Sequence, residues 1–234
     1  MVLVTWWGHS SLEFRTESNR ILCDPIDDRS LCSQIGETSV APNAIFVSHS
    51  HWDHYSPSTL SRLASESTIL FGAEGDVDFS LLPGSMGSVE TRLLQAGDVV
   101  DLGDTAVEVF VSSEGVSYLF TFKKEDLVAF FMGDSLVLQP MKAIQADFVF
   151  FPFWLLKNER AAPALHVFLE NVLSVPVHFH RDPEARPNFY VSDDEFARLT
   201  EEISHMLELP RGEPHCLCVD GSKVAVRQSG PETL

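Results

Sequence analysis

The chain has 234 residues, and its 34 acidic residues outnumber its 16 lysines and arginines, which gives a formal net charge of −18. A hydrophobic content of 44% is that of an ordinary globular protein, so the composition excludes disordered, collagen-like and disulfide-dense chains. The negative charge repels phosphate backbones and anionic lipid surfaces. A chain of this length can bury a hydrophobic core. Because of its negative charge, we expect neither nucleic acid nor a membrane among its partners.

Export and membrane insertion are both disfavoured by the sequence. The opening segment MVLVTWWGHSSLEF lacks the basic residues and the long apolar run of a signal peptide. The longest apolar stretch, residues 146–156, is shorter than the ~20 residues that span a bilayer. The four cysteines are too few to staple a domain of this size, so we expect reduced thiols. Together these features predict a cytoplasmic protein.

The first quarter of the chain is predicted to form short strands followed by one helix. Its β-prone runs are separated by turn residues, and the last of them is continuously apolar, as in a strand covered on both faces. Ser56 followed by Pro57 is typical of a helix start, because serine caps the helix and proline suits its first position. The predicted strands are residues 2–7, 12–15, 20–23 and 44–47.

A second group of β-prone runs fills the middle of the chain. These runs alternate with turn residues from about residue 69 to residue 132, and we expect them to form a second sheet. Residues 148–151 are predicted to add a further strand. The predicted strands of the second sheet are residues 89–94, 106–111, 116–122 and 127–132.

Two helices and a hairpin are expected near the C-terminus. Residues 165–173 carry apolar side chains at the spacing of an amphipathic helix. Residues 192–207 begin with a Ser-x-x-Glu capping box and continue with one apolar helical face. Residues 216–227 read as two strands joined by an Asp-Gly turn.

The order of these elements predicts an α/β domain built in layers. Strands and then helices recur without a linker, which favours a single domain over residues 1–234 in which helices cover two sheets. The alternative is a division into two domains near residues 85–88, where glycines and serines cluster. A turn inside one domain explains that cluster equally well.

The strongest chemical signal is the segment His-Ser-His-Trp-Asp-His at residues 49–54. In an extended segment His49 and His51 point the same way, so their imidazoles can share one metal ion. Asp53 and His54 leave as the chain turns and can reach a second position. The alternative is a polar loop in which the histidines merely precede the helix that starts at Pro57.

Further motifs accompany this segment along the chain. TWWGHSSLEF and ILCDPI precede it, and FFMGDS and VPVHF follow it. In this order the motifs resemble the metallo-β-lactamase superfamily of metal-dependent hydrolases, whose signature is H-x-H-x-D-H. The first two resemble the branch that includes ascorbate-6-phosphate lactonase-like and N-acyl-phosphatidylethanolamine phospholipase-like proteins. The resemblance covers residues 3–180 and implies an α/β (α+β) fold, a four-layer αββα sandwich with metals at one edge.

The resemblance also implies a set of metal ligands. Asp134 matches the aspartate that bridges two metals, and His178 matches the final histidine. One expected histidine is absent, because no histidine lies between Tyr55 and Asp134. Ser113 and Glu114 lie nearest its place, and Glu114 is a possible replacement ligand. The implied metal ligands are His49, His51, Asp53, His54, Asp134 and His178.

The number of ions follows from counting these ligands. Asp53, His54, Asp134 and His178 form a complete set that should fill with a divalent metal. A second ion would use His49, His51 and Asp134, and would need Glu114 or water in place of the absent histidine. We therefore expect one or two divalent ions, with zinc favoured and manganese or iron as alternatives.

Three more residues are candidates for supporting roles. His180 could assist or replace His178. His9 could hydrogen-bond the substrate or a metal ligand, or be a purely structural histidine. Asp24 is expected to orient the histidine segment or the water on the metal, although an aspartate before proline is often only a turn former.

These features predict a metal-dependent hydrolase. A metal-bound hydroxide would attack a small ester-type substrate, such as a phosphodiester, a phosphorylated lactone or an amide-like ester, and Asp53 would orient it or accept its proton. Residues 151–155 could line the cleft. The alternative is a degenerate member that binds metal or ligand without catalysis. An RNA-processing nuclease conflicts with the charge, and a homo-oligomer is compatible with the sequence.

Overall fold

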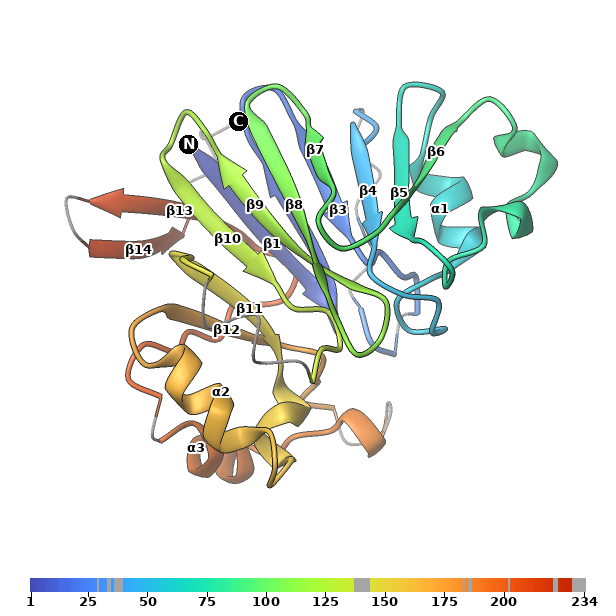
Figure 1. Ribbon diagram of the computed structural model, residues 1–234. Helices are drawn as coiled ribbons and strands as arrows, with labels where there is room; N and C mark the ends of the chain where they lie inside the picture. The colour runs from blue at the N-terminus through green and yellow to red at the C-terminus, as the bar shows by residue number, and fades with distance from the viewer. Residues whose placement is uncertain are drawn as a thin grey trace.

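The computed structural model describes residues 1–28, 30–32, 35, 40–136, 144–182, 184, 187–201, 203–220 and 223–228. Two β-sheets lie face to face and enclose the main hydrophobic core (Figure 1). Within these residues, no helix is long and apolar enough to cross a membrane. The mixed α/β architecture with two sheets confirms the predicted fold class.

The first sheet contains both ends of the described chain. Its strands run in the order β14-β13-β1-β2-β3-β4-β5-β6, and those from β3 to β6 are parallel. Its strands are β1 (Val2–Gly8), β2 (Ser11–Arg15), β3 (Arg20–Cys23), β4 (Ala44–Val47), β5 (Ile69–Ala73), β6 (Glu90–Leu94), β13 (Pro214–Asp220) and β14 (Lys223–Gln228).

The second sheet is formed by the middle of the chain. Its order is β12-β11-β10-β9-β8-β7, with β10, β11 and β12 parallel and the others antiparallel. Its strands are β7 (Val99–Asp101), β8 (Thr105–Val111), β9 (Val116–Phe122), β10 (Leu127–Phe131), β11 (Phe148–Pro152) and β12 (Leu173–Val177).

Aromatic side chains join the two sheets across the core. Phe14 of the first sheet lies 5.1 Å from Phe120 and 5.5 Å from Phe150 of the second, measured between ring centroids. Phe46 lies 5.0 Å from Tyr118 in the same way. Rings of this size bury large apolar areas and stabilise the contact by tilted packing. The runs β4 and β11 are buried at every position, which explains their continuous apolar sequence.

In the part of the chain that the structure describes, three α-helices cover the outer faces of the sheets. The two serines predicted to cap helices do so: the Ser56 hydroxyl accepts a hydrogen bond from Thr59 N, and the Ser192 hydroxyl accepts one from Glu195 N. In Figure 1, α1 lies beside β5, whereas α2 and α3 lie beside β11 and β12. The α-helices are α1 (Pro57–Leu63), α2 (Ala162–Leu169) and α3 (Asp193–Thr200), and the 3₁₀ turns are η1 (Phe79–Leu81), η2 (Gly84–Met86), η4 (Phe153–Lys157) and η5 (Pro187–Phe189).

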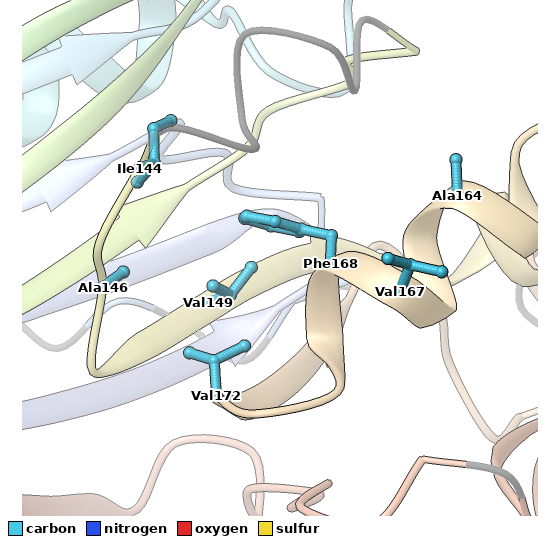
Figure 2. Close-up of a pocket in the computed structure, with 7 residues that line it drawn as sticks. All are labelled: Ile144, Ala146, Val149, Ala164, Val167, Phe168 and Val172. Atoms are coloured by element: carbon cyan, nitrogen blue, oxygen red, sulfur yellow. The ribbon is translucent and has the colours of Figure 1, made fainter.

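Between α2 and β11 the surface is hollowed. The hollow is an apolar cavity of about 310 Å³. Figure 2 shows the side chains that line it, with Phe168 of α2 and Val149 of β11 facing each other. Apart from the aromatic Phe168, the lining side chains are aliphatic. None of the predicted metal ligands lines it, so it is separate from the histidine segment.

Two predictions about the elements were wrong. Residues 89–94 were expected in the second sheet, but β6 pairs in parallel with β5 of the first. The helices are also shorter than their apolar stripes, because Leu173 starts β12 and α3 ends at Thr200. The chain beyond α3 instead pairs with β12, where Ser174 N donates to His205 O (2.8 Å) and Leu207 N donates to Ser174 O (2.9 Å).

The predicted C-terminal hairpin is present as β13 and β14. The two strands pair antiparallel from His215 opposite Gln228 to Asp220 opposite Lys223. The turn expected at Asp220-Gly221 falls partly outside the described residues, which omit 221 and 222.

Candidate metal centre

The predicted site residues follow the C-terminal ends of strands that run in the same direction. In the first sheet these strands are β1, β3 and β4, and in the second they are β10 and β12. The C-terminal ends of parallel strands lie at one edge of a sheet, which is where α/β folds place their sites. The residues that follow them are His9, Asp24, His49 to His54, Asp134 and His178.

Four of these side chains form a compact cluster. The Nε2 atoms of His54 and His178 lie 3.1 Å apart. Asp134 Oδ2 lies 3.2 Å from His178 Nε2 and 3.6 Å from His54 Nε2, and Asp53 Oδ2 lies 3.5 Å from His178 Nε2. His54 and His178 are buried, with 1% and 4% of their side chains exposed. The four tips therefore converge on one point although their residues span both sheets.

Asp24 holds this cluster in place from behind. Its carboxyl group is fully buried and accepts hydrogen bonds from Ser48 N (2.7 Å), Ser48 Oγ (2.6 Å) and His54 Nδ1 (2.7 Å). Because Nδ1 of His54 is the donor, the Nε2 atom that faces His178 is the one available to a cation. The turn-former alternative for Asp24 therefore does not account for its three side-chain bonds.

Asp24 also orients His49, through the hydroxyl group of Ser48. Since the Ser48 hydroxyl donates to Asp24, it accepts from His49 Nδ1 (2.9 Å), which leaves His49 Nε2 as an acceptor. His49 Nε2 lies 3.1 Å from His51 Nδ1. One buried aspartate thus orients two imidazoles, those of His49 and His54.

Glu114 lies at the outer end of the histidine segment. Its Oε2 atom is 4.0 Å from His51 Nε2, and the two side chains are 52% and 57% exposed. The contact brings Glu114 beside His51 rather than into the buried cluster. Ser113 instead joins two loops, because its hydroxyl donates to Asp134 O (3.1 Å) and accepts from Leu136 N (2.8 Å).

His9 lies inside the centre. Its Nε2 atom is 3.0 Å from Asp53 Oδ2, and its ring centroid is 3.8 Å from that of His178. Its carbonyl oxygen accepts from Trp6 Nε1 and from His178 N, both at 2.8 Å. His9 therefore holds the candidate ligand Asp53 by its side chain and the candidate ligand His178 by its backbone carbonyl group.

His180 is placed apart from this cluster. It is buried and lines a cavity with Trp6 and Arg181, and its amide donates to Phe189 O (3.1 Å). The positive φ of +63° at His178 breaks the extended geometry that would keep both histidines on one face.

Electrostatics within the cluster favour added positive charge. Burial alone lowers the pKa of His54, but the neighbouring Asp134 and Asp24 carboxyl groups raise it to about 10. Burial would raise the pKa of Asp53 and Asp134, yet the imidazoles around them, above all His9 for Asp53 and His178 for Asp134, hold both far below 3.8. The carboxylates thus stay ionised and draw a cation or proton toward His54.

Two other histidines carry no charge at neutral pH. Burial lowers the pKa of His9 to about 3 and that of His49 to about 4. His9 and His49 therefore bring no positive charge to the buried site that the carboxyl groups of Asp24, Asp53 and Asp134 surround. Such a buried acidic cluster is stable only with a compensating cation.

The comparisons with known proteins identify the family. A profile described as "Beta-lactamase superfamily domain" matches residues 3–153. The chain belongs to this superfamily. A "UPF0173 metal-dependent hydrolase" from Opitutus terrae is 25% identical over 202 residues, which cover 78% of this chain and 87% of that protein.

Solved structures of other hydrolases share the fold. Igni18, a metallo hydrolase from the archaeon Ignicoccus hospitalis, matches with a TM-score of 0.67 at 12% identity, covering 98% of this chain and 99% of that one. An isothiocyanate hydrolase from Delia radicum gut bacteria matches with a TM-score of 0.67 at 12% identity, covering 92% and 99%. The profile match over residues 3–153 confirms the predicted superfamily, and the names of the relatives agree with the predicted enzyme class. The lactonase-like branch stays a prediction.

Two features of this centre have no strong sequence signal. Ser48 links Asp24 to both histidines, yet serine is too common for its role to be read from the sequence. Phe189, at the end of the 3₁₀ turn η5, packs edge-on against His9 (4.6 Å) and His178 (5.2 Å), measured between ring centroids. Residues 151–155 were expected to line a cleft, but Phe151, Phe153 and Leu155 are fully buried in the core.

Proposed function

We propose that this chain is a hydrolase whose centre holds a divalent cation between His54, His178, Asp53 and Asp134. The observation that carries the proposal is the 3.1 Å approach of two imidazole Nε2 atoms flanked by two carboxylates. Two nitrogens cannot both be acceptors at that distance without a shared proton or cation. Asp134 Oδ1 is buried and accepts no hydrogen bond from the described residues, so this oxygen is also available to coordinate the cation.

The donor set agrees with a transition metal. Two imidazoles and two carboxylates suit zinc, manganese or iron, and zinc is the favoured ion. When bound, such an ion acts as a Lewis acid and lowers the pKa of water toward ~7. Asp24 orients His54, and His9 holds Asp53 through Nε2. Because the pKa of Asp53 is low, its carboxylate is ionised and able to orient water or accept a proton.

A second, weaker cation site would use His49 and His51. Their Nε2 and Nδ1 atoms approach to 3.1 Å, and Glu114 lies beside His51. Glu114 would have to move inward to replace the absent histidine, since it is half-exposed at the outer end. We propose one tightly held ion and a second held less tightly.

For the substrate we propose a small ester-type molecule. A phosphodiester or a phosphorylated lactone offers an electrophilic atom bonded to an oxygen that a cation can polarise. The resemblance of TWWGHSSLEF to the ascorbate-6-phosphate lactonase-like branch supports the lactone. The cytoplasmic location and a homo-oligomeric state remain predictions.

The test combines metal content with turnover. Purified protein would be loaded with Zn²⁺, Mn²⁺ or Fe²⁺ and assayed against generic phosphodiester and lactone substrates. We expect Asp134→Ala and His54→Ala to lower kcat/KM at least about 100-fold and to lose bound metal, because each removes a ligand. His205→Ala, an exposed histidine, serves as the matched control and should change neither quantity.

Different results separate the alternatives. Bound metal with no turnover on any substrate would favour the degenerate, non-catalytic member. Metal content and activity that are unchanged in folded Asp134→Ala protein would remove this cluster as the centre.

A further inference from the structure

A second cavity with a positively charged lining lies next to the metal centre. Its volume is about 280 Å³, and it is bounded by the end of β1, the segment after β12 and the segment before β13. None of the predicted metal ligands lines it. Its lining residues are Trp6, His180, Arg181, Glu208, Leu209, Pro210 and Arg211.

Arg181 is a fixed and neutralised part of this lining. Its guanidinium donates to both carboxylate oxygens of Glu208, at 3.1 and 2.8 Å, and to the carbonyl oxygens of Val191 and Ser192. It also lies 4.1 Å above the ring of Phe196. A planar guanidinium group held by these bonds, a fork of N–H donors, stays in one orientation. Arg181 therefore shapes the cavity, and Glu208 cancels its charge.

Arg211 has no such partner. No hydrogen bond or ion pair joins its guanidinium to any residue that the structure describes. Its backbone is nevertheless fixed, because the next amide, Gly212 N, donates to Trp6 O (2.7 Å). Its side chain packs on β1, where a Cβ added at Gly8 would lie 3.1 Å from Arg211 Cδ. The result is an arginine whose backbone and stem are held at a cavity, and whose five guanidinium N–H donors form no hydrogen bond with the described residues.

The local charge runs against that of the whole molecule. Among the arginine and carboxylate side chains that line the cavity, Arg181 and Glu208 cancel, which leaves the guanidinium of Arg211 as the unpaired charge. The chain as a whole carries −18. A charge of the minority sign, held at a concave site, is the arrangement that selects small ions of the opposite sign.

We propose that this cavity binds a small oxyanion, a carboxylate or a phosphate group, through the guanidinium of Arg211. The fork of donors matches two oxygens of such a group, and the indole of Trp6 with Leu209 and Pro210 accepts the adjoining carbon atoms. Trp6 also donates to His9 O, so the site borders the metal centre without sharing its ligands. The proposal is independent of the hydrolytic function.

The experiment is calorimetric titration of the full chain with inorganic phosphate, acetate and glycerol phosphate at constant ionic strength in chloride. We expect saturable one-to-one binding, and the ranking of the three anions distinguishes a carboxylate site from a phosphate site. Arg211→Met should weaken binding at least about tenfold, since it removes charged hydrogen bonds. Arg211→Lys keeps the charge but loses the fork, and should weaken binding less.

Two matched variants decide where the anion binds. Arg198→Met makes the same charge change on the exposed face of α3 and should leave binding unchanged. Asp134→Ala disables the proposed metal centre and should also leave anion binding unchanged. The proposal is overturned if no anion binds saturably, if folded Arg211→Met binds like the unaltered chain, or if Asp134→Ala abolishes binding. Should Arg211→Met fail to fold, equal affinity in Arg211→Lys and the unaltered chain would count against the fork.

Discussion

At the residue scale, the centre depends on side chains that a metal would never touch. Asp24 accepts three hydrogen bonds and thereby aims His54 directly and His49 through Ser48. Its backbone lies at a φ of +44°, and His9 and His178 also have positive φ values of 46° and 63°. Such conformations cost about 1–3 kcal/mol each and persist where surrounding contacts impose them. The strain is concentrated at the edge where the ligands converge.

Asp24→Asn tests this indirect role. Asparagine keeps the shape but cannot accept from both His54 Nδ1 and the Ser48 donors as an anion does. We expect the affinity for Zn²⁺ or Mn²⁺ to fall about 10–100-fold, the usual effect of losing such a supporting carboxylate. Competition with a chromophoric chelator measures the change. Asp98→Asn, which alters an exposed turn where the carboxylate accepts from Gln95 N, should have the affinity of the unaltered chain.

At the element scale, the turn between β8 and β9 is pressed against the end of β4. Val116 N donates to Ser48 O (3.0 Å), so this turn positions the residue that links Asp24 to the histidines. Gly115 has a φ of +62°, and a Cβ there would lie 2.0 Å from Ser48 O and 2.8 Å from His49 Cβ. Only glycine permits the backbones to approach so closely. Gly115, which follows Ser113 and Glu114, thus allows the turn to pack against the start of the histidine segment.

Gly115→Ala should therefore destabilise the fold and disturb the metal centre together. We expect a loss of about 3 kcal/mol in the free energy of unfolding, from backbone strain plus the clash with Ser48. Gly97→Ala is the matched control, because Gly97 has a φ of +97° but nothing within 4 Å of an added Cβ. It should cost about 1 kcal/mol from strain alone. Equal losses in urea unfolding of the two variants would contradict the close-approach argument.

At the scale of the whole molecule, the two sheets are also joined at the end away from the metal centre. Asp104, in the turn between β7 and β8, accepts from Thr16 Oγ1 (2.7 Å) and from Asn19 Nδ2, both in the turn between β2 and β3. Asn19 Nδ2 also donates to Leu102 O (2.8 Å). These polar bonds supplement the aromatic contacts between the sheets.

This link predicts a dependence of stability on pH. Burial opposes ionisation of Asp104, but the hydrogen bonds from Thr16, Thr105 and Asn19 lower its pKa below the ordinary 3.8. A carboxyl group with a lowered pKa in the folded state stabilises the fold above pH 4 and loses that contribution as the pH falls. Asp104→Asn should thus be less stable than the unaltered chain by about 1 kcal/mol at pH 7. Urea unfolding at pH 7 and pH 3 should show the difference shrinking in acid, and a constant difference would contradict this assignment.

Local sequence patterns were enough to predict several strands, two helix caps and the histidine segment of this protein. The segments predicted as residues 20–23 and 44–47 match β3 and β4, and both serine caps are used, because strand periodicity and capping depend on neighbours in the chain. The HSHWDH segment carries its signal within six residues. The superfamily was identifiable for the same reason, since its motifs are short and lie in a characteristic order.

Tertiary structure decided the rest. Whether β6 joins the first or second sheet depends on which strand it meets, and α3 ends where the following residues pair with β12 instead. The support of His54 by Asp24 and of Asp53 by His9 joins residues 30 and 44 positions apart. No local pattern encodes such contacts, because they form only when the two sheets pack and bring the ends of separate strands to one edge.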